Sequence, residues 1–378
     1  MQTALKPKYV FRLLLLTVLL ASASVVGAQS KPDAPSQFSA LAAKAEGARE
    51  GDRLTEAAAL YRRALALRPT WAEGWFYLGT IHYDRNEFSS AAQAFRRVVA
   101  IQPKTGTAMA MLGLSEFQLG LDASALKHLQ AAKEIGVADD TDLRQTLLFD
   151  EALLLQRKGG FEKAQESLET LCQQNVERED QVQILGMVQL RLRTTDPGAK
   201  SSPSPDIFRR LGHAACLAAR KKFDEARPEY AGIVKDYPDF PNVHFAFGNF
   251  LLNIPDIPAA REQFEQEIKR NPKDVVSRLK IAAALYRTDS SAGIPYAEQA
   301  VQLDPKLSFA HYLYGLLLLD TDDYKRAIPE LETAKKGITD DPKLYFALGT
   351  AYARAGRTAD AERARAQFQR LQKGTTNQ

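Results

Sequence analysis

The chain has 378 residues, of which 45% are hydrophobic and 25% are charged, proportions that are ordinary for a folded globular protein. It carries 50 basic and 46 acidic residues. Three of the basic residues and none of the acidic ones lie in residues 1–28, so the remainder has 47 against 46 and a net charge of +1. A chain so close to neutrality lacks the strong positive field of nucleic-acid-binding proteins, and we expect no nucleic-acid partner.

The N-terminus has the organisation of a secretory signal peptide. Lys6, Lys8 and Arg12 precede an uncharged run over residues 13–26, and small residues follow up to Ala28. This pattern predicts removal of residues 1–28 and a periplasmic or extracellular protein, with no stable membrane span left after cleavage. The alternative is an uncleaved membrane anchor, although the apolar run is shorter than the roughly 20 residues that a spanning helix needs.

Three residue types recur along the chain with a period of 34. The period is seen in Pro69 and Pro103, in Ala57, Ala91 and Ala125, in Gly79 and Gly113, and in Gly315 and Gly349. This is the period of tetratricopeptide repeats, and the order of residues within it also resembles that family. The unit that begins at Ala72 carries Trp75, Leu78, Gly79, Ala91, Phe95 and Pro103 in the family's order, departing from it at His82, where the family prefers Tyr.

The resemblance implies an all-α fold, a right-handed superhelical solenoid of antiparallel helix pairs. Small residues at the glycine and alanine positions would let the two helices of a unit approach closely. Proline ends the second helix because it lacks a donor and clashes with the preceding turn. Each unit has apolar faces on both helices that it cannot bury alone, so the units must stack.

We count eight units, of which those beginning at Gln145 and Val275 are degenerate. Residues 179–193 form one predicted helix with no second helix after it, followed by a loop rich in Pro and Ser. The loop is either a surface insertion in one array or a flexible joint between two. The predicted organisation is a signal peptide at 1–28, a disordered leader at 29–37, repeat blocks at 38–193 and 207–378, and a linker at 194–206.

Patterns that carry chemistry are missing from the sequence. There is no glycine-rich phosphate loop, no CxxC and no HExxH. Four of the five histidines fall at packing positions of separate units, and paired aspartates fall at turns or helix starts, where they cap helices. Cys172 and Cys216 favour two buried thiols over a disulfide. We therefore expect a protein that is not an enzyme, with no catalytic residue, cofactor or metal.

The resemblance also implies that certain positions of the first helix in each unit line a concave groove. Selected residues at these positions are Phe76, Thr80, Tyr83, Phe117, Phe245, Asn249, Asn253, Tyr286, Phe309 and Tyr312, and the same rule selects Asp84. Aromatic side chains interleaved with polar groups suit an extended peptide or a helix of a protein partner, although each ring could instead pack against a neighbouring helix.

Three functions are consistent with this groove. The first is an exported scaffold for protein–protein interaction, for example in assembly of an envelope complex. A glycan-binding or enzyme-associated module and a self-assembling structural solenoid are the alternatives. One branch of the family grips a C-terminal carboxylate with Lys, Asn and Arg, but Phe245 stands where that clamp needs Lys, so the resemblance does not extend to it.

Overall fold

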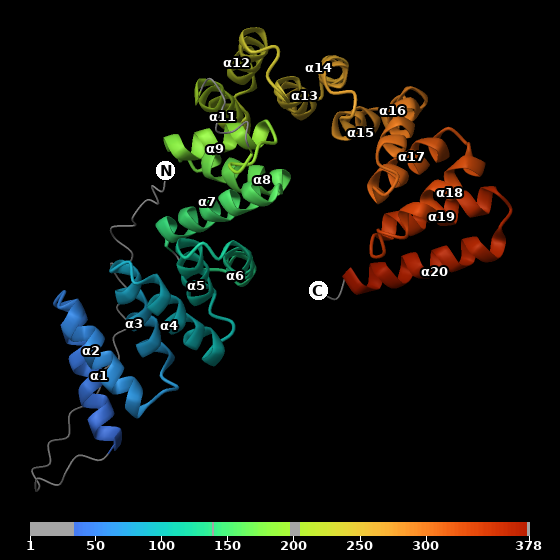
Figure 1. The fold of residues 1–378 in the computed structure, drawn as a ribbon. Helices are drawn as coiled ribbons and strands as arrows, with labels where there is room; N and C mark the ends of the chain where they lie inside the picture. The colour runs from blue at the N-terminus through green and yellow to red at the C-terminus, as the bar shows by residue number, and fades with distance from the viewer. Residues whose placement is uncertain (1–33, 138–139, 197–204, 376–378) are drawn as a thin grey trace, which may run out of the picture. The chain divides into compact units, whose positions relative to one another are not determined.

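The computed structural model describes residues 34–137, 140–196 and 205–375, and over these ranges the chain forms helices and no strand (Figure 1). The 19 helices of the described residues are α1 Ala34–Glu50, α2 Leu54–Leu67, α3 Ala72–Asp84, α4 Phe88–Ile101, α5 Gly106–Gln118, α6 Asp122–Ile135, α7 Thr141–Lys158, α8 Phe161–Gln173, α9 Glu179–Gln189, α11 Pro205–Ala219, α12 Phe223–Asp236, α13 Val243–Asn253, α14 Ile257–Arg270, α15 Val275–Leu285, α16 Ser290–Leu303, α17 Ser308–Asp320, α18 Tyr324–Ala334, α19 Pro342–Arg354 and α20 Thr358–Thr375. The prediction of an all-α solenoid is confirmed.

The described residues group into two compact units. Unit 1 runs through Gln181 and takes in residues 192–196, and unit 2 consists of Val182–Arg191 and the residues from 205 onward. Helices pair within each unit, α1 with α2 through α7 with α8 in unit 1, and α11 with α12 through α19 with α20 in unit 2. These are nine pairs over the described ranges. The expected count of eight is one too low, and the stretches from Gln145 and Val275, which that count included as degenerate units, both form complete pairs.

The first helix of each pair ends in a repeated turn. Asp52, Asn86 and Gly120 follow one another at intervals of 34 residues, and all have positive φ. After Asn86 the backbone N–H of Glu87 bonds the carbonyl of His82 over 2.8 Å, the six-residue bond that closes a Schellman motif. The left-handed residue reverses the chain within a few residues, so the second helix of the pair can fold back onto the first.

Glycine allows the two helices of a pair to touch. A Cβ on Gly79 of α3 would lie 2.9 Å from the Phe95 ring of α4, and one on Gly248 of α13 would lie 2.8 Å from the Phe264 ring of α14. Both rings are completely buried. These two pairs therefore show the role predicted for the small residue, which is to let the two helices approach closely.

In unit 2, residues 182–189 of α9 do have a helical neighbour, although the sequence suggested none. A Cβ on Gly186 would lie 1.9 Å from the carbonyl oxygen of Phe208 in α11, and one on Gly212 would lie 1.8 Å from that of Val182. The two helices thus cross backbone to backbone. The Asn242 side chain also donates a hydrogen bond of 2.8 Å to the Leu190 carbonyl. The sequence shows no second helix because α11, which covers α9, lies beyond the loop.

Three further expectations can be compared with the structure. The signal peptide and residues 29–33 of the leader lie outside the described residues, as do residues 197–204 of the linker, whereas α1 begins at Ala34, inside the expected leader. No helix of the described ranges is long and apolar enough to cross a membrane.

The expectation of free thiols is wrong, because Cys172 and Cys216 are both disulfide-bonded. Helical periodicity carries no information on how far apart two sulfur atoms lie.

Candidate functional site

Unit 2 exposes aromatic rings on its last two first helices. Phe309 of α17 is 49% exposed and Phe346 of α19 is 60% exposed. The Phe309 ring lies 6.5 Å from that of Tyr312, and the Phe346 ring lies 5.6 Å from that of Phe368 in α20. Helices α15, α17 and α19 contact one another in succession. We call Tyr286, Phe309, Tyr312 and Phe346 the C-terminal aromatic surface.

Electrostatic effects link the members of this surface. Burial raises the pKa of Tyr312 to about 12, and the Asp341 carboxylate and the Tyr286 hydroxyl act in the same direction. Asp341 caps α19, accepting a hydrogen bond of 2.8 Å from the Lys343 backbone N–H. The guanidinium of Arg287 lies 5.2 Å from the centre of the Tyr286 ring. The end of α15 and the starts of α17 and α19 therefore meet in one area, with aromatic rings and a capping carboxylate together.

The residues predicted on α13 are less accessible. Phe245 is 3% exposed, with its ring 5.8 Å from that of Phe264 and 5.5 Å from the Arg191 guanidinium. Asn249 is half-buried and Asn253 is exposed at the end of the helix. Residues 182–191 cover this part of unit 2, which explains why Phe245 is buried. Of the residues predicted on α13, only Asn249 and Asn253 are open enough to meet a partner.

In unit 1 the predicted residues lie on α3 and α5. Phe76 is half-buried, with its ring 5.7 Å from that of Phe95, and Thr80 donates a hydrogen bond of 2.8 Å to the Tyr77 carbonyl. Tyr83 is 6% exposed and packs edge-on against Phe88. Phe117 is half-buried, and the Arg157 guanidinium lies 5.4 Å from the centre of its ring. Partner binding by these residues stays a prediction.

Two carboxylates stand beside Tyr83. Burial raises the pKa of Asp84, at the end of α3, to about 6 even though the residue is exposed on one side, and burial raises that of Asp150, in α7, to about 7. Burial also raises the pKa of the Tyr83 hydroxyl, and both carboxylates reinforce the effect.

Models of protein families match the chain in four segments. The tetratricopeptide repeat model matches residues 42–104, 76–140, 214–275 and 279–342, which together span more than half of the sequence. The chain belongs to the tetratricopeptide repeat family. The structure displays helix pairs, close contacts at glycine and turns that recur every 34 residues, as expected for that family.

Two curated proteins are similar to this tetratricopeptide repeat protein. "Hsp70-Hsp90 organizing protein 1" of Glycine max is 28% identical over 37% of the chain, and "Protein CTR9 homolog" of Arabidopsis thaliana is 23% identical over 76% of it. The aligned parts amount to 22% and 25% of those proteins, so the chain spans about a quarter of the length of the curated relatives it matches.

Solved structures give more distant likenesses. MamA from Desulfovibrio magneticus, residues 41 to the end, matches with a TM-score of 0.40 and 19% identity, over 45% of this chain and 94% of that one. Yeast Tom70 matches with a TM-score of 0.38 and 14% identity, over 89% and 84%. Likenesses at this level say nothing about function.

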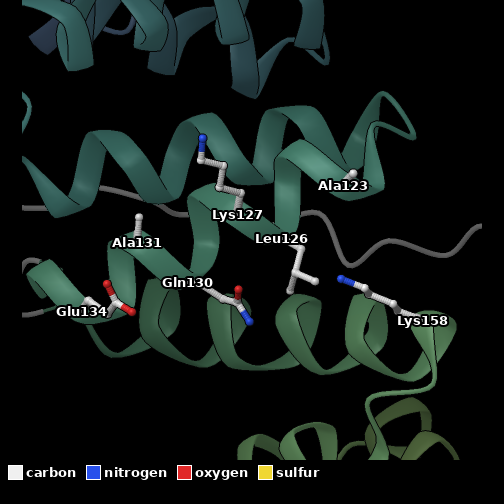
Figure 2. A pocket seen from close by; sticks show the side chains of 7 residues that line it. All are labelled: Ala123, Leu126, Lys127, Gln130, Ala131, Glu134 and Lys158. Atoms are coloured by element: carbon white, nitrogen blue, oxygen red, sulfur yellow. The ribbon is translucent and has the colours of Figure 1, made fainter. Parts of the chain in front are cut away.

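Two shallow pockets among the described residues have no lining residue that was predicted for the groove. One, of about 350 Å³, lies between α6 and α7, with Leu126 and Lys127 on α6 and Lys158 on α7 (Figure 2). The other, of about 330 Å³, lies along α14 beside Leu285. Both are open surface depressions formed mainly by second helices.

Three of the histidines bond a side chain of their own repeat. His128 bonds Glu116 over 2.6 Å, His244 bonds Gln263 over 2.8 Å, and His311 bonds Glu330 over 2.6 Å. Over the described ranges no three His, Cys, Asp or Glu side chains gather where they could hold a metal ion.

Sequence reasoning missed two residues of interest. Phe346 occupies the fifth position of the unit from Pro342, the same position as Tyr312 in its own unit, so applying the rule to the last unit would have selected it. Asp150 lies in the degenerate unit from Gln145, where the register of the pattern is uncertain. The rule offered no comparable signal there.

Proposed function

We propose that this tetratricopeptide repeat protein is a scaffold that binds another protein through the first helices of its repeats. The observation that carries the proposal is the exposure of Phe309 and Phe346 on adjacent first helices. Exposed aromatic side chains with polar groups around them are typical of protein-binding surfaces, because their burial releases water from a large apolar area. The name of the soybean relative describes a protein that organises two others, which supports the same role.

The site of action is a second part of the proposal. The signal-like segment at residues 1–28 favours export to an envelope or extracellular space, where the scaffold would assist assembly of an envelope complex. N-terminal sequencing of the protein recovered from cells tests this. A chain that starts at Gln29 supports export by cleavage, and one that retains residues 1–28 in the membrane fraction supports the anchored alternative.

Affinity capture tests the scaffold. Native chain and a Phe309→Ala/Phe346→Ala variant would be used to capture proteins from the same extract, with Leu303→Ala as the matched control. Leu303 is also exposed, at 40%, but it ends the second helix α16. We expect a specific protein captured by the native chain and the control, and at least tenfold less by the double variant, as expected for loss of two aromatic anchors.

Two other results would contradict the scaffold. Recovery of only further copies of the same chain would favour a self-assembling solenoid. Loss of binding to glycans in the double variant, with no captured protein, would favour a carbohydrate-binding module. Circular dichroism of all variants would establish that the differences do not come from unfolding.

A further inference from the structure

One face of the second helix α6 forms most of the depression between α6 and α7. Ala123, Lys127, Ala131 and Glu134 follow one another at intervals of three or four residues and so share this face, and Lys158, the last residue of α7, completes the lining (Figure 2). The small alanine side chains on either side of Lys127 leave the surface low. The face extends over about 16 Å from Ala123 to Glu134, since a helix rises about 1.5 Å per residue.

Two ion pairs join the helices that border this depression. At the start of α6, Asp122 accepts a hydrogen bond of 3.3 Å from Arg157, near the end of α7. Near the end of α6, Lys133 bonds Glu151 of α7 over 3.2 Å. The two antiparallel helices are therefore connected near both ends of the depression, which keeps its lining residues in a constant arrangement.

The lining carries two lysines whose charge is not used within the chain. Lys127 and Lys158 are both exposed, and neither ammonium group forms an ion pair or a hydrogen bond with another of the described residues. Figure 2 shows the Lys158 side chain reaching from α7 toward Leu126 of α6. Glu134 is the acidic residue of the lining, and it lies about 10 Å further along α6 than Lys127. The depression is therefore basic at one end and acidic at the other.

We propose that this depression binds an acidic amphipathic helix of a protein partner. Carboxylates of that helix pair with Lys127 and Lys158, and an aliphatic side chain covers Leu126 between the low positions at Ala123 and Ala131. A length of about 16 Å accommodates roughly three turns of a helix, and a helix packs well in the groove between two others. This surface belongs to a second helix and to the end of α7, and it is separate from the C-terminal aromatic surface.

The charges favour a helix over an anionic membrane. A lipid surface would place negative headgroups against every part of the depression, including Glu134, where they would be repelled. A helix can carry carboxylates opposite Lys127 and Lys158 and a basic residue opposite Glu134. Because all three side chains lie at the rim, these pairs would determine which partner binds and how fast more than how tightly.

A selection of helical peptides tests the proposal. Fifteen-residue amphipathic helices with one randomised face would be displayed on phage and selected on the immobilised full chain, and enriched peptides would be labelled for anisotropy titrations. The proposal predicts a family of peptides with Asp or Glu at two constant positions. Their affinity should fall at least tenfold in a Lys127→Glu/Lys158→Glu variant, because attraction becomes repulsion at both positions.

The matched control is Lys163→Glu, since Lys163 is also exposed on a second helix, α8, but lies outside the depression. Neither this change nor Phe309→Ala/Phe346→Ala should alter binding of the acidic peptides. Peptides with lysine at the two constant acidic positions should bind the Lys127→Glu/Lys158→Glu variant and recover most of the lost affinity, because the charges are then exchanged. Circular dichroism would establish that the variants remain folded.

The remaining outcomes would overturn the proposal. These are a selection without an acidic family, acidic peptides that bind the Lys127→Glu/Lys158→Glu variant as tightly as the native chain, and a loss that the exchanged charges do not recover. Vesicles of phosphatidylglycerol and phosphatidylcholine give a further arm. If they bind the native chain but not the variant while no acidic peptide is enriched, the surface binds a membrane. None of these results affects the scaffold function, which depends on Phe309 and Phe346.

Discussion

Asp150 shows how the burial of a single carboxylate affects stability. Its carboxyl has a pKa of about 7, against an ordinary value of 3.8, because burial disfavours the charged form. The folded chain therefore holds a proton at pH values where the unfolded chain has released it. Such a group lowers stability as pH rises from about 4 to about 7, and the penalty is complete above that range.

Asp150→Asn is therefore expected to stabilise the protein at neutral pH. At pH 8 the variant should exceed the native chain in free energy of unfolding by on the order of 2–4 kcal/mol, and the difference should shrink as pH falls to 4. Urea unfolding followed by circular dichroism across this range measures it. A difference that does not change with pH would mean that the carboxylate is partnered or hydrated in the folded state.

The repeated turn is the clearest feature at the level of elements. It needs a residue with positive φ, which glycine adopts freely and other residues adopt at a cost. Gly120, with a φ of 72°, suits this turn, whereas Lys221, with a φ of 61°, does not. The side chain of Lys221 is exposed and forms no hydrogen bond or ion pair with the described residues, while its backbone N–H donates a hydrogen bond of 2.9 Å to the Ala218 carbonyl. The packing of α11 and α12 therefore holds this turn in a conformation that the backbone of lysine disfavours.

Lys221→Gly should accordingly raise the free energy of unfolding by about 1 kcal/mol, since it removes the left-handed penalty. The matched change is Gly120→Ala. Added at Gly120, a Cβ meets no atom within 4 Å, so any destabilisation there comes from the backbone alone. Differential scanning calorimetry would measure both. A stabilised Gly120→Ala or a destabilised Lys221→Gly would show that these turns relax away from positive φ.

At the scale of the whole molecule, the array could be predicted because each repeat signals itself locally. Gly79 faces Phe95 and Gly248 faces Phe264 as the spacing implies, and a short-range pattern is enough to predict a fold made of local pairs. Features that depend on contacts outside one pair could not be predicted. The disulfide state of the cysteines is one, and the cover that residues 182–191 place over Phe245 is another.

The candidate surfaces follow the same division. Phe309 and Tyr312 could be selected by position, and the structure leaves Phe309 open. Tyr83 could also be selected, but position alone says nothing about its burial or about the carboxylates beside it. Asp150 lies in a stretch whose spacing is irregular. The position of a residue in the repeat therefore indicates the helix face that it occupies. Its side-chain contacts also depend on neighbouring repeats, which that position does not describe.

One measurement tests the central claim most directly, namely that the first helices of unit 2 bind another protein. A photo-crosslinking amino acid would replace Phe346, with Leu303 replaced in a matched chain, and the cells producing each would be irradiated. Both positions are exposed, and only the first belongs to the C-terminal aromatic surface. The account predicts an adduct between position 346 and a different protein, absent at position 303. Adducts of equal yield at both positions, or an adduct only with a second copy of the chain, would contradict it.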